Sequence, residues 1–291
     1  EEQNQWLPLS LDPDPRSTIG GWIGADRRTP LAGSFGSIRD YLLGMAYMDA
    51  EGRILRAGGR VVKNVAGYDL MKLFTGSLGQ LGIIVEATFK VLPRPARWGA
   101  LLLQEPEPSV IRSTLEHAPQ LFPAALWRLG TSEGESLALV FAGSTPRVTA
   151  QIARAQVLWS QGGRVLEHEE TLALVAALER DTRPDGVPVA WGGALPEFLS
   201  RSKLGSLLGN RWTADLLRGH FWARLNGPHT LSESQHVFRE GEGHVNVDAP
   251  SEHPLAEPWG SEPQDIDLER GLKNALDPTG RFVHGRWPGR T

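Results

Sequence analysis

Three glycine-rich clusters lie between strand-like runs in the early part of the chain. They are Thr18-Ile19-Gly20-Gly21-Trp22-Ile23-Gly24, the run from Gly58 to Asp69, and Gly76-Ser77-Leu78-Gly79-Gln80-Leu81-Gly82. Glycine adopts positive φ at little cost, and successive main-chain N–H groups in such a turn form a concave anion site. The clusters therefore predict main chain that closely approaches a bound anion, and a pyrophosphate is the expected occupant.

The last cluster has a regular spacing that continues directly into a strand. Gly76, Gly79 and Gly82 recur at every third position, and Ile83-Ile84-Val85 follows without a break. Small residues at this spacing would let a flat ligand pass close to the main chain before the strand begins. A tight packing corner explains the same pattern, and the residues alone do not decide between the two.

The middle cluster also carries polar side chains of four kinds. Lys63, Asn64, Tyr68 and Asp69 bring a cation, an amide, a phenol and a carboxylate close together in sequence. Polar groups within a glycine-rich loop indicate ligand contact. The alternative is a solvated loop in which Asp69 caps a helix over residues 70–74.

Local patterns in the early part predict antiparallel strands. Residues 41–49 and 53–57 are strand-like, and Glu51-Gly52 between them marks a tight reversal. Residues 85–91 alternate between apolar and polar, which is typical of a half-buried strand, and Pro93 ends that strand.

The later part has longer strand-like and helix-like segments, so we place a domain boundary at Pro93–Pro95. Residues 137–142 and 164–166 are expected strands, and residues 148–158 form an expected helix that Gly162-Gly163 ends. Further expected elements are a helix over 171–178, a strand over 220–225, a helix over 266–276 and irregular, mobile structure over 227–260. Alternating strands and helices of this kind predict an α+β layer.

Composition excludes several classes of function. The chain has 291 residues and a formal net charge of -4, which argues against a nucleic-acid partner. It has no cysteine, which excludes disulfides, iron–sulfur ligation and a cysteinyl cofactor link within this chain, and fits a reducing cytoplasm. The longest apolar runs fall far short of the roughly 20 residues of a membrane-spanning helix. Glu1 opens the sequence without a signal-peptide pattern, so we expect the chain to begin mid-protein.

Common catalytic signatures are absent. The sequence has no Walker A loop, no G-x-G-x-x-G, no H-E-x-x-H and no G-x-S-x-G. His229, His236 and His244 admit a metal or acid–base role, but solvated loop histidines are the favoured interpretation. We therefore assign no catalytic residue and no metal ligand. The ten tryptophans are expected in the core or in subunit contacts.

Five motifs in one order carry a family resemblance. They are Asp12-x-Asp14-x-Arg16-x-Thr18-x-Gly20-Gly21, Phe35-Gly36-x-x-Arg39-Asp40-x-x-Leu43-Gly44, Gly58-Gly59-x-Val61-Val62-Lys63-Asn64-Val65-Ala66-Gly67-Tyr68-Asp69-Leu70, Gly76-Ser77-Leu78-Gly79-x-Leu81-Gly82 and Lys90-Val91-Leu92-Pro93-Arg94-Pro95. Together they resemble the second half of a FAD-binding domain of the vanillyl-alcohol oxidase (PCMH-type) superfamily. Residues 62–69 and 92–95 are most similar to the accessory flavin-domain subunits of glycolate oxidases.

The resemblance implies an α+β fold in two domains. Residues 1–95 would form the C-terminal half of a PCMH-type FAD-binding domain, and residues 96–291 an α+β cap domain of FAD-linked oxidases. The first half of the flavin domain, with its glycine-rich pyrophosphate loop, would lie before Glu1. The cofactor would be FAD, and the residues implied to bind it are Thr18, Gly20, Gly21, Gly24, Lys63, Asn64, Tyr68, Asp69, Gly76, Ser77, Gly79, Gly82, Ile83 and Ile84.

The expected function is that of an oxidoreductase component. The resemblance implies an accessory subunit in the oxidation of glycolate or a related 2-hydroxy acid, together with a catalytic flavoprotein subunit and an iron–sulfur subunit. Its location would be cytoplasmic, with peripheral association at the inner face of the membrane through its complex as a further option. Two alternatives stay open: a stand-alone FAD-dependent 2-hydroxy-acid dehydrogenase, and a flavin-free structural or assembly subunit.

Overall fold

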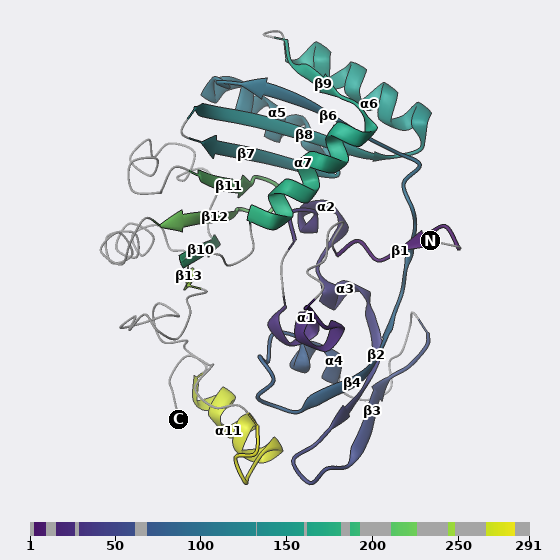
Figure 1. The fold of residues 1–291 in the computed structure, drawn as a ribbon, viewed down its shortest axis with the longest axis vertical. Coiled ribbons are helices and arrows are strands. Elements are labelled where there is room, and N and C mark those ends of the chain that lie inside the picture. Colours follow the sequence, from purple (N-terminus) through teal and green to yellow (C-terminus); the bar gives the residue numbers. More distant parts are fainter. Residues whose placement is uncertain are drawn as a thin grey trace. The chain divides into compact units, whose positions relative to one another are not determined.

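The chain forms two compact units, each assembled from segments that are far apart in sequence. A computed structural model describes residues 3–9, 16–26, 29–61, 69–131, 133–159, 162–181, 187–192, 211–225, 244–247 and 266–282 (Figure 1). The first unit comprises Glu1–Thr29, Gly36–Pro93 and Glu262–Thr291, and the second comprises Pro30–Phe35 and Arg94–Ser261. The expected irregular segment over 227–260 lies largely outside the described residues.

The first unit is built on an antiparallel sheet of three strands in the order β3-β2-β4. Strand β2 (Leu42–Met48) pairs with β3 (Ile54–Gly58) and with β4 (Ile83–Phe89). A short pair, β1 (Gln5–Trp6) with β5 (Leu92–Pro93), joins the two ends of the unit's early segment. The hairpin and the strand that the sequence predicts here are confirmed.

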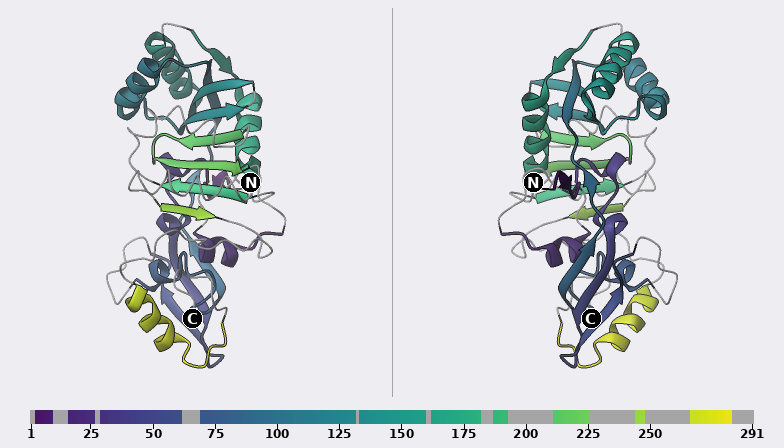
Figure 2. Two further views of the ribbon diagram at one scale, coloured as in Figure 1. Left: turned by 90° about the vertical axis from the view of Figure 1, so that its left-hand side faces the viewer. Right: turned by 90° about the vertical axis from the view of Figure 1, so that its right-hand side faces the viewer.

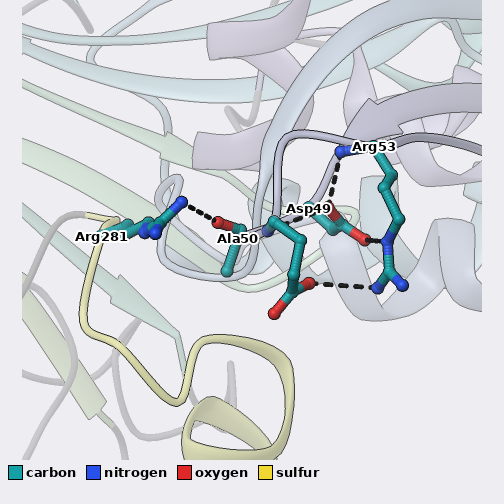
Figure 3. Close-up of polar contacts among 5 residues, drawn as sticks. Asp49, Ala50, Arg53 and Arg281 are labelled. Carbon is teal, nitrogen blue, oxygen red and sulfur yellow. Dashed lines mark hydrogen bonds and ion pairs between the residues drawn. The ribbon is translucent and has the colours of Figure 1, made fainter.

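The hairpin between β2 and β3 is closed by a carboxylate. Asp49 accepts hydrogen bonds from the main-chain N–H groups of Glu51 and Arg53, at 3.1 and 2.8 Å, and Gly52 has a φ of 82°. The Arg53 side chain returns to Asp49 at 2.7 Å, which holds the pKa of that carboxyl below its usual value against the opposing effect of desolvation. Figure 3 shows these contacts. The reversal expected at Glu51-Gly52 therefore has a defined structure.

The regular alternation of apolar and polar residues that we expected along β4 is interrupted at one position. The ladder of β2 and β4 shifts its register between Ala46 and Tyr47, which leaves Val85 unpaired as a bulge. A bulge inserts one residue and so exchanges the two faces of a strand. Ile84 and Ala87 consequently face the core of the unit, whereas Val85 is half exposed.

Four helices of the first unit cover one face of this sheet. They are α1 (Ile19–Ala25), α3 (Ile38–Tyr41), α4 (Leu70–Phe74) and α11 (Ile266–Leu276). Trp22, Ile23 and Ile38 form one apolar cluster with Leu42, and a second cluster joins Met45, Tyr47, Phe74 and Leu81 with Leu272 and Leu276. The core of the first unit is therefore completed by a helix near the C-terminal end of the chain.

The second unit is built on one antiparallel sheet of eight strands in the order β13-β10-β12-β11-β7-β8-β6-β9 (Figure 2). The strands are β6 (Arg97–Gln104), β7 (Ala125–Thr131), β8 (Gly134–Gly143), β9 (Arg164–Leu166), β10 (Val187–Gly192), β11 (Arg211–Asp215), β12 (His220–Leu225) and β13 (His244–Val247). The strands predicted over 137–142, 164–166 and 220–225 are confirmed. Strand β13 corrects the expectation of irregular structure over 227–260, because Val245 and Val247 alternate with polar residues and favour a strand.

Two helices pack on one face of this sheet and form the core of the second unit. They are α5 (Pro108–Leu121) and α6 (Thr145–Leu158), and their apolar residues join Leu101, Leu139 and Phe141 from the strands. A third helix, α7 (His168–Asp181), contacts β6 and β9. The helices and strands expected in this part are confirmed, as is the α+β class. Trp127 and Trp159 are fully buried, as expected of core tryptophans.

The segment that includes α2 (Ala32–Phe35) belongs to the second unit. Trp127 donates from its indole N–H to the carbonyl oxygen of Pro30 at 2.9 Å, and Ser34 donates to the carbonyl oxygen of Pro123 at 2.5 Å. Leu31 is fully buried. A short piece of chain from between α1 and α3 is therefore part of the core around β7.

Asp215, at the end of β11, is the most perturbed carboxyl in the described part of the second unit. It is 1% exposed, and its Oδ1 atom accepts the N–H of Leu217 at 3.0 Å. Its Oδ2 atom has no partner among the described residues, and the side chain lies against the Cα of Gly33. Desolvation raises the pKa of Asp215 to about 7, although main-chain hydrogen bonds oppose the shift.

Replacing Asp215 by Asn is expected to stabilise the second unit more at pH 8 than at pH 5. The folded pKa of about 7 lies above the ordinary value of 3.8, so the folded state retains the proton and stability falls as pH rises between those values. Removing the ionisable group should raise the free energy of unfolding by about 1–3 kcal/mol at pH 8. Urea denaturation, monitored by tryptophan fluorescence, measures the free energy of unfolding of both proteins at each pH. An equal gain in the free energy of unfolding at pH 5 and pH 8 would contradict the raised pKa of Asp215.

Candidate functional site

Helix α1 begins and ends with defined caps. Thr18 accepts the N–H of Gly21 on its hydroxyl oxygen at 3.0 Å, and Asp26 ends the helix in the left-handed conformation. Trp22, Ile23 and Gly24 are buried against the sheet, whereas Gly21 is exposed. The first glycine cluster is thus a short helix with one buried face and one open face.

The glycine turn, defined as residues 76–82, lies beside the end of α1. The N–H of Gly76 donates to the carbonyl oxygen of Ile23 at 3.0 Å, and the N–H of Leu78 donates to the carbonyl oxygen of Gly24 at 2.7 Å. Gly76 and Gly79 have φ of 83° and 78°, a conformation that glycine adopts without strain. The structure therefore brings together two of the three glycine clusters, which are about 50 positions apart in the sequence.

The glycines of this surface differ in what surrounds them. A Cβ at Gly82 would lie 2.9 Å from the carbonyl oxygen of Met48 and 3.0 Å from the ring of Phe74, so this glycine permits tight packing. A Cβ at Gly20 would lie 3.3 Å from the carbonyl oxygen of Ile84. At Gly79 no atom lies within 4 Å of that position, so the main chain is open there. Tight packing thus explains Gly82, whereas ligand contact at the open main chain of Gly79 stays a prediction.

Most main-chain amides of the glycine turn are hydrogen-bonded within the protein. Besides Gly76 and Leu78, the N–H of Ser77 bonds to Phe74 and that of Gln80 to Ser77. Two buried side-chain atoms next to the turn, Oδ1 of Asp26 and Nε2 of Gln80, have no partner among the described residues. The turn therefore offers an open main-chain surface at Gly79, and not an array of free amides.

The remaining predicted residues of the turn face in different directions. Ser77 is 2% exposed and Ile84 packs in the core of the first unit, so neither side chain lies on the open surface. Ile83 is 53% exposed and Ile19, on α1, is 48% exposed. Ile84 faces the core under the helices, so its neighbour Ile83 points to the opposite face of β4, and Ile19 is an exposed apolar side chain on the helix side.

Asp69 caps α4. Its carboxylate accepts the N–H of Lys72 at 3.3 Å and pairs with the Lys72 ammonium at 3.0 Å, and both side chains are substantially exposed. The helix over residues 70–74 is present, as the alternative interpretation requires. Lys63, Asn64 and Tyr68 lie outside the described residues, so contact of this loop with a cofactor stays a prediction.

Other parts of the described chain offer little sign of chemistry. Among the described residues, no group of three or more His, Asp or Glu side chains is placed to hold a metal ion, and no helix is long and apolar enough to cross a membrane. A pocket of about 590 Å³ in the second unit is lined mainly by apolar side chains such as Phe35 and Phe122, with Arg147 among them. None of the predicted site residues lines it.

Lys273 is a contact of the glycine turn that sequence reasoning missed. Its ammonium group, on α11, donates to the carbonyl oxygen of Gln80 at 2.7 Å and pairs with Asp277. A Lys and an Asp four positions apart on a helix usually form an exposed pair. The sequence therefore carries no local signal that this pair is buried.

Comparison with known proteins identifies the family. The chain is 31% identical over 293 aligned positions to glycolate oxidase subunit GlcE of Escherichia coli, an alignment that covers 93% of this chain and 71% of that protein. It therefore includes both units. The chain belongs to the glycolate oxidase subunit GlcE family. No family model matches the sequence.

Other relatives match only part of the chain. Glycolate oxidase subunit GlcD of Bacillus subtilis is 44% identical over 98 residues, which is 32% of this chain and 21% of that protein. A D-lactate dehydrogenase of Archaeoglobus fulgidus is 33% identical over 122 residues, or 40% of this chain and 28% of that protein. The GlcE family thus shares a segment with larger 2-hydroxy-acid oxidising proteins.

Solved structures show the same fold at low sequence identity. A xylooligosaccharide oxidase of Myceliophthora thermophila superposes with a TM-score of 0.63 at 16% identity, covering 95% of this chain and 72% of that one. An alkyldihydroxyacetonephosphate synthase superposes with a TM-score of 0.62 at 16% identity, covering 96% of this chain and 60% of that one. The predicted fold of PCMH-type FAD-linked oxidases is therefore confirmed.

Replacing Gly82 by Ala is expected to destabilise the first unit by about 1–3 kcal/mol, because the added methyl group would overlap Met48 and Phe74. Gly59→Ala is the matched control, since its Cβ would meet no atom within 4 Å and its φ lies outside the left-handed region. That variant should change stability by no more than about 0.5 kcal/mol. Chemical denaturation of both variants measures the difference. Equal losses would contradict the packing role.

Proposed function

We propose that this chain is a FAD-binding accessory subunit of a glycolate oxidase-like complex that oxidises glycolate or a related 2-hydroxy acid. The observation that carries the proposal is the similarity to GlcE along 93% of the chain, through both units. Relatives that share part of the chain include GlcD and D-lactate dehydrogenases, whose names also point to 2-hydroxy acids.

The surface formed by α1 and the glycine turn supports FAD as the ligand. The main chain at Gly79 is open, and Ile19 on α1, which is 48% exposed, offers apolar area to a flat ring. Gly21, Gly76 and Gly79, which are not buried, would let the ligand approach the main chain. When bound, FAD would supply a redox centre for the oxidation that the complex catalyses, and the chain would supply its position and surroundings.

The proposed partners are a catalytic flavoprotein subunit and an iron–sulfur subunit. A chain without cysteine has no thiolate ligands for an iron–sulfur cluster, so onward electron transfer through such a cluster would need another subunit. The similarity to GlcD over 98 residues supports a related flavin domain in the catalytic partner. The proposed location is the cytoplasm, with association at the inner face of the membrane through the complex.

Addition of FAD to the full-length protein tests the proposal. We expect flavin absorption bands to stay with the protein after gel filtration, and turnover of glycolate to require the partner subunits. Protein that stays colourless with added FAD would favour the flavin-free structural subunit. Turnover of a 2-hydroxy acid by this protein alone would favour the stand-alone dehydrogenase.

Gly79→Ala is expected to weaken FAD binding by about tenfold or more, because the methyl group would occupy the open space beside the main chain. Gly52→Ala, in the hairpin of the same unit, is the matched control. Both glycines have positive φ, 78° and 82°, and open surroundings, so both variants should lose a similar 1–2 kcal/mol, roughly, to backbone strain. Fluorescence titration measures FAD affinity. Equal affinities in the two variants would remove Gly79 from the site.

A further inference from the structure

The described C-terminal segment, residues 266–282, packs on the first unit and reaches the glycine turn. Leu272 and Leu276 of α11 join the apolar cluster that contains Phe74, just before the turn, and Leu81, within it. Lys273 lies between these leucines in sequence, and its ammonium group bonds to the carbonyl oxygen of Gln80, 193 positions away. The turn is thus held by α1 on its early side and by α11 on its later side.

The contact at Gln80 is made by a buried charge. The Lys273 side chain is 13% exposed, and its partner Asp277 is fully buried at 2.5 Å. Lys273 also lies 5.7 Å from the centre of the Phe282 ring. A buried lysine is costly unless hydrogen bonds and an opposite charge compensate it, and both are present here. The two apolar leucines already dock the helix, so docking alone does not require this charge.

Three groups donate hydrogen bonds to the carboxylate of Asp277. It accepts the Lys273 ammonium, the N–H of Arg281 at 2.8 Å and the N–H of Phe282 at 2.9 Å. Burial by itself would raise the pKa of Asp277, but these hydrogen bonds outweigh burial and lower the pKa to about 2. The carboxylate therefore stays ionised and holds both the lysine and the chain that follows the helix.

Arg281 extends the same arrangement to the β2–β3 hairpin. Its Nη1 atom donates to the carbonyl oxygen of Ala50 at 2.8 Å (Figure 3). Ala50 lies in the reversal that Asp49 and Arg53 close. One end of α11 thus bonds to main-chain oxygens of both the glycine turn and the hairpin.

We propose that Lys273, Asp277 and Arg281 form a C-terminal clamp that positions the glycine turn for FAD, so that flavin affinity depends on Lys273. Lys273 is a positioning residue: it fixes the carbonyl of Gln80, next to the open main chain at Gly79. Without it, Gln80 loses a buried hydrogen bond and the turn can open locally. This inference rests on the proposed function, since it concerns the same surface.

The test uses the full-length protein with Lys273→Met and Asp277→Asn combined. The double variant removes both charges, and the Asn side chain keeps one acceptor oxygen, which can serve one of the amides of Arg281 and Phe282. In FAD-free protein, hydrogen exchange of the amides of residues 76–84 should become about tenfold faster or more, with β8 unchanged. Titration should show FAD affinity weaker by about tenfold. Asn274→Met, exposed on the same helix, is the control and should leave both quantities unchanged.

The outcomes separate this inference from the proposed function. Equal FAD affinity in wild type and double variant, with wild type binding FAD, would overturn the clamp and leave the proposed function standing. Wild-type protein that does not bind FAD would overturn both, even if exchange in the turn increased. If the double variant does not fold, the same two measurements are made on Lys273→Gln, which replaces the charged ammonium group by a neutral polar amide. Unchanged hydrogen exchange in the turn and unchanged FAD affinity in Lys273→Gln would overturn the clamp.

Discussion

Two main-chain hydrogen bonds, from Gly76 to Ile23 and from Leu78 to Gly24, hold the first unit in its observed arrangement. They join the end of α1 to the turn that connects α4 with β4. Because β4 pairs with the central strand β2, the position of the turn also sets where the strand enters the sheet. The helix on one side and the sheet on the other thus depend on a contact between main chains, and Gly76 takes part in it with a positive φ that glycine adopts without strain.

The glycines that suggested a phosphate site serve several physical purposes. Gly58 has a φ of 70°, and a Cβ there would lie 2.3 Å from the carbonyl oxygen of Leu43. This position therefore requires glycine, because the end of β3 lies close to the main chain of β2. Gly82 is required by packing, whereas Gly79 is open. A sequence shows the density of glycine but not the neighbours of each one. The motif could therefore be predicted, but the division between packing and ligand contact could not.

Sequence reasoning succeeded where the signal was local. The hairpin of residues 42–58 and helix α6 follow from turn residues and apolar spacing, and both are observed. It failed at the bulge in β4, because a shift of register depends on the partner strand. It also assigned no role to Lys273, which lies within the helix predicted over residues 266–276. That residue's role depends on a contact with Gln80, for which spacing within the helix carries no information.

Two buried carboxylates show how surroundings decide what such a group does. Asp277 accepts three hydrogen bonds, so its pKa falls to about 2 and its charge is structural. Asp215 has an unpartnered oxygen among the described residues and a pKa of about 7, the value expected of a general base. A general base must also reach its substrate, and Asp215 is 1% exposed against Gly33. The perturbed pKa thus arises from burial, and the same burial denies Asp215 the access that a general base needs.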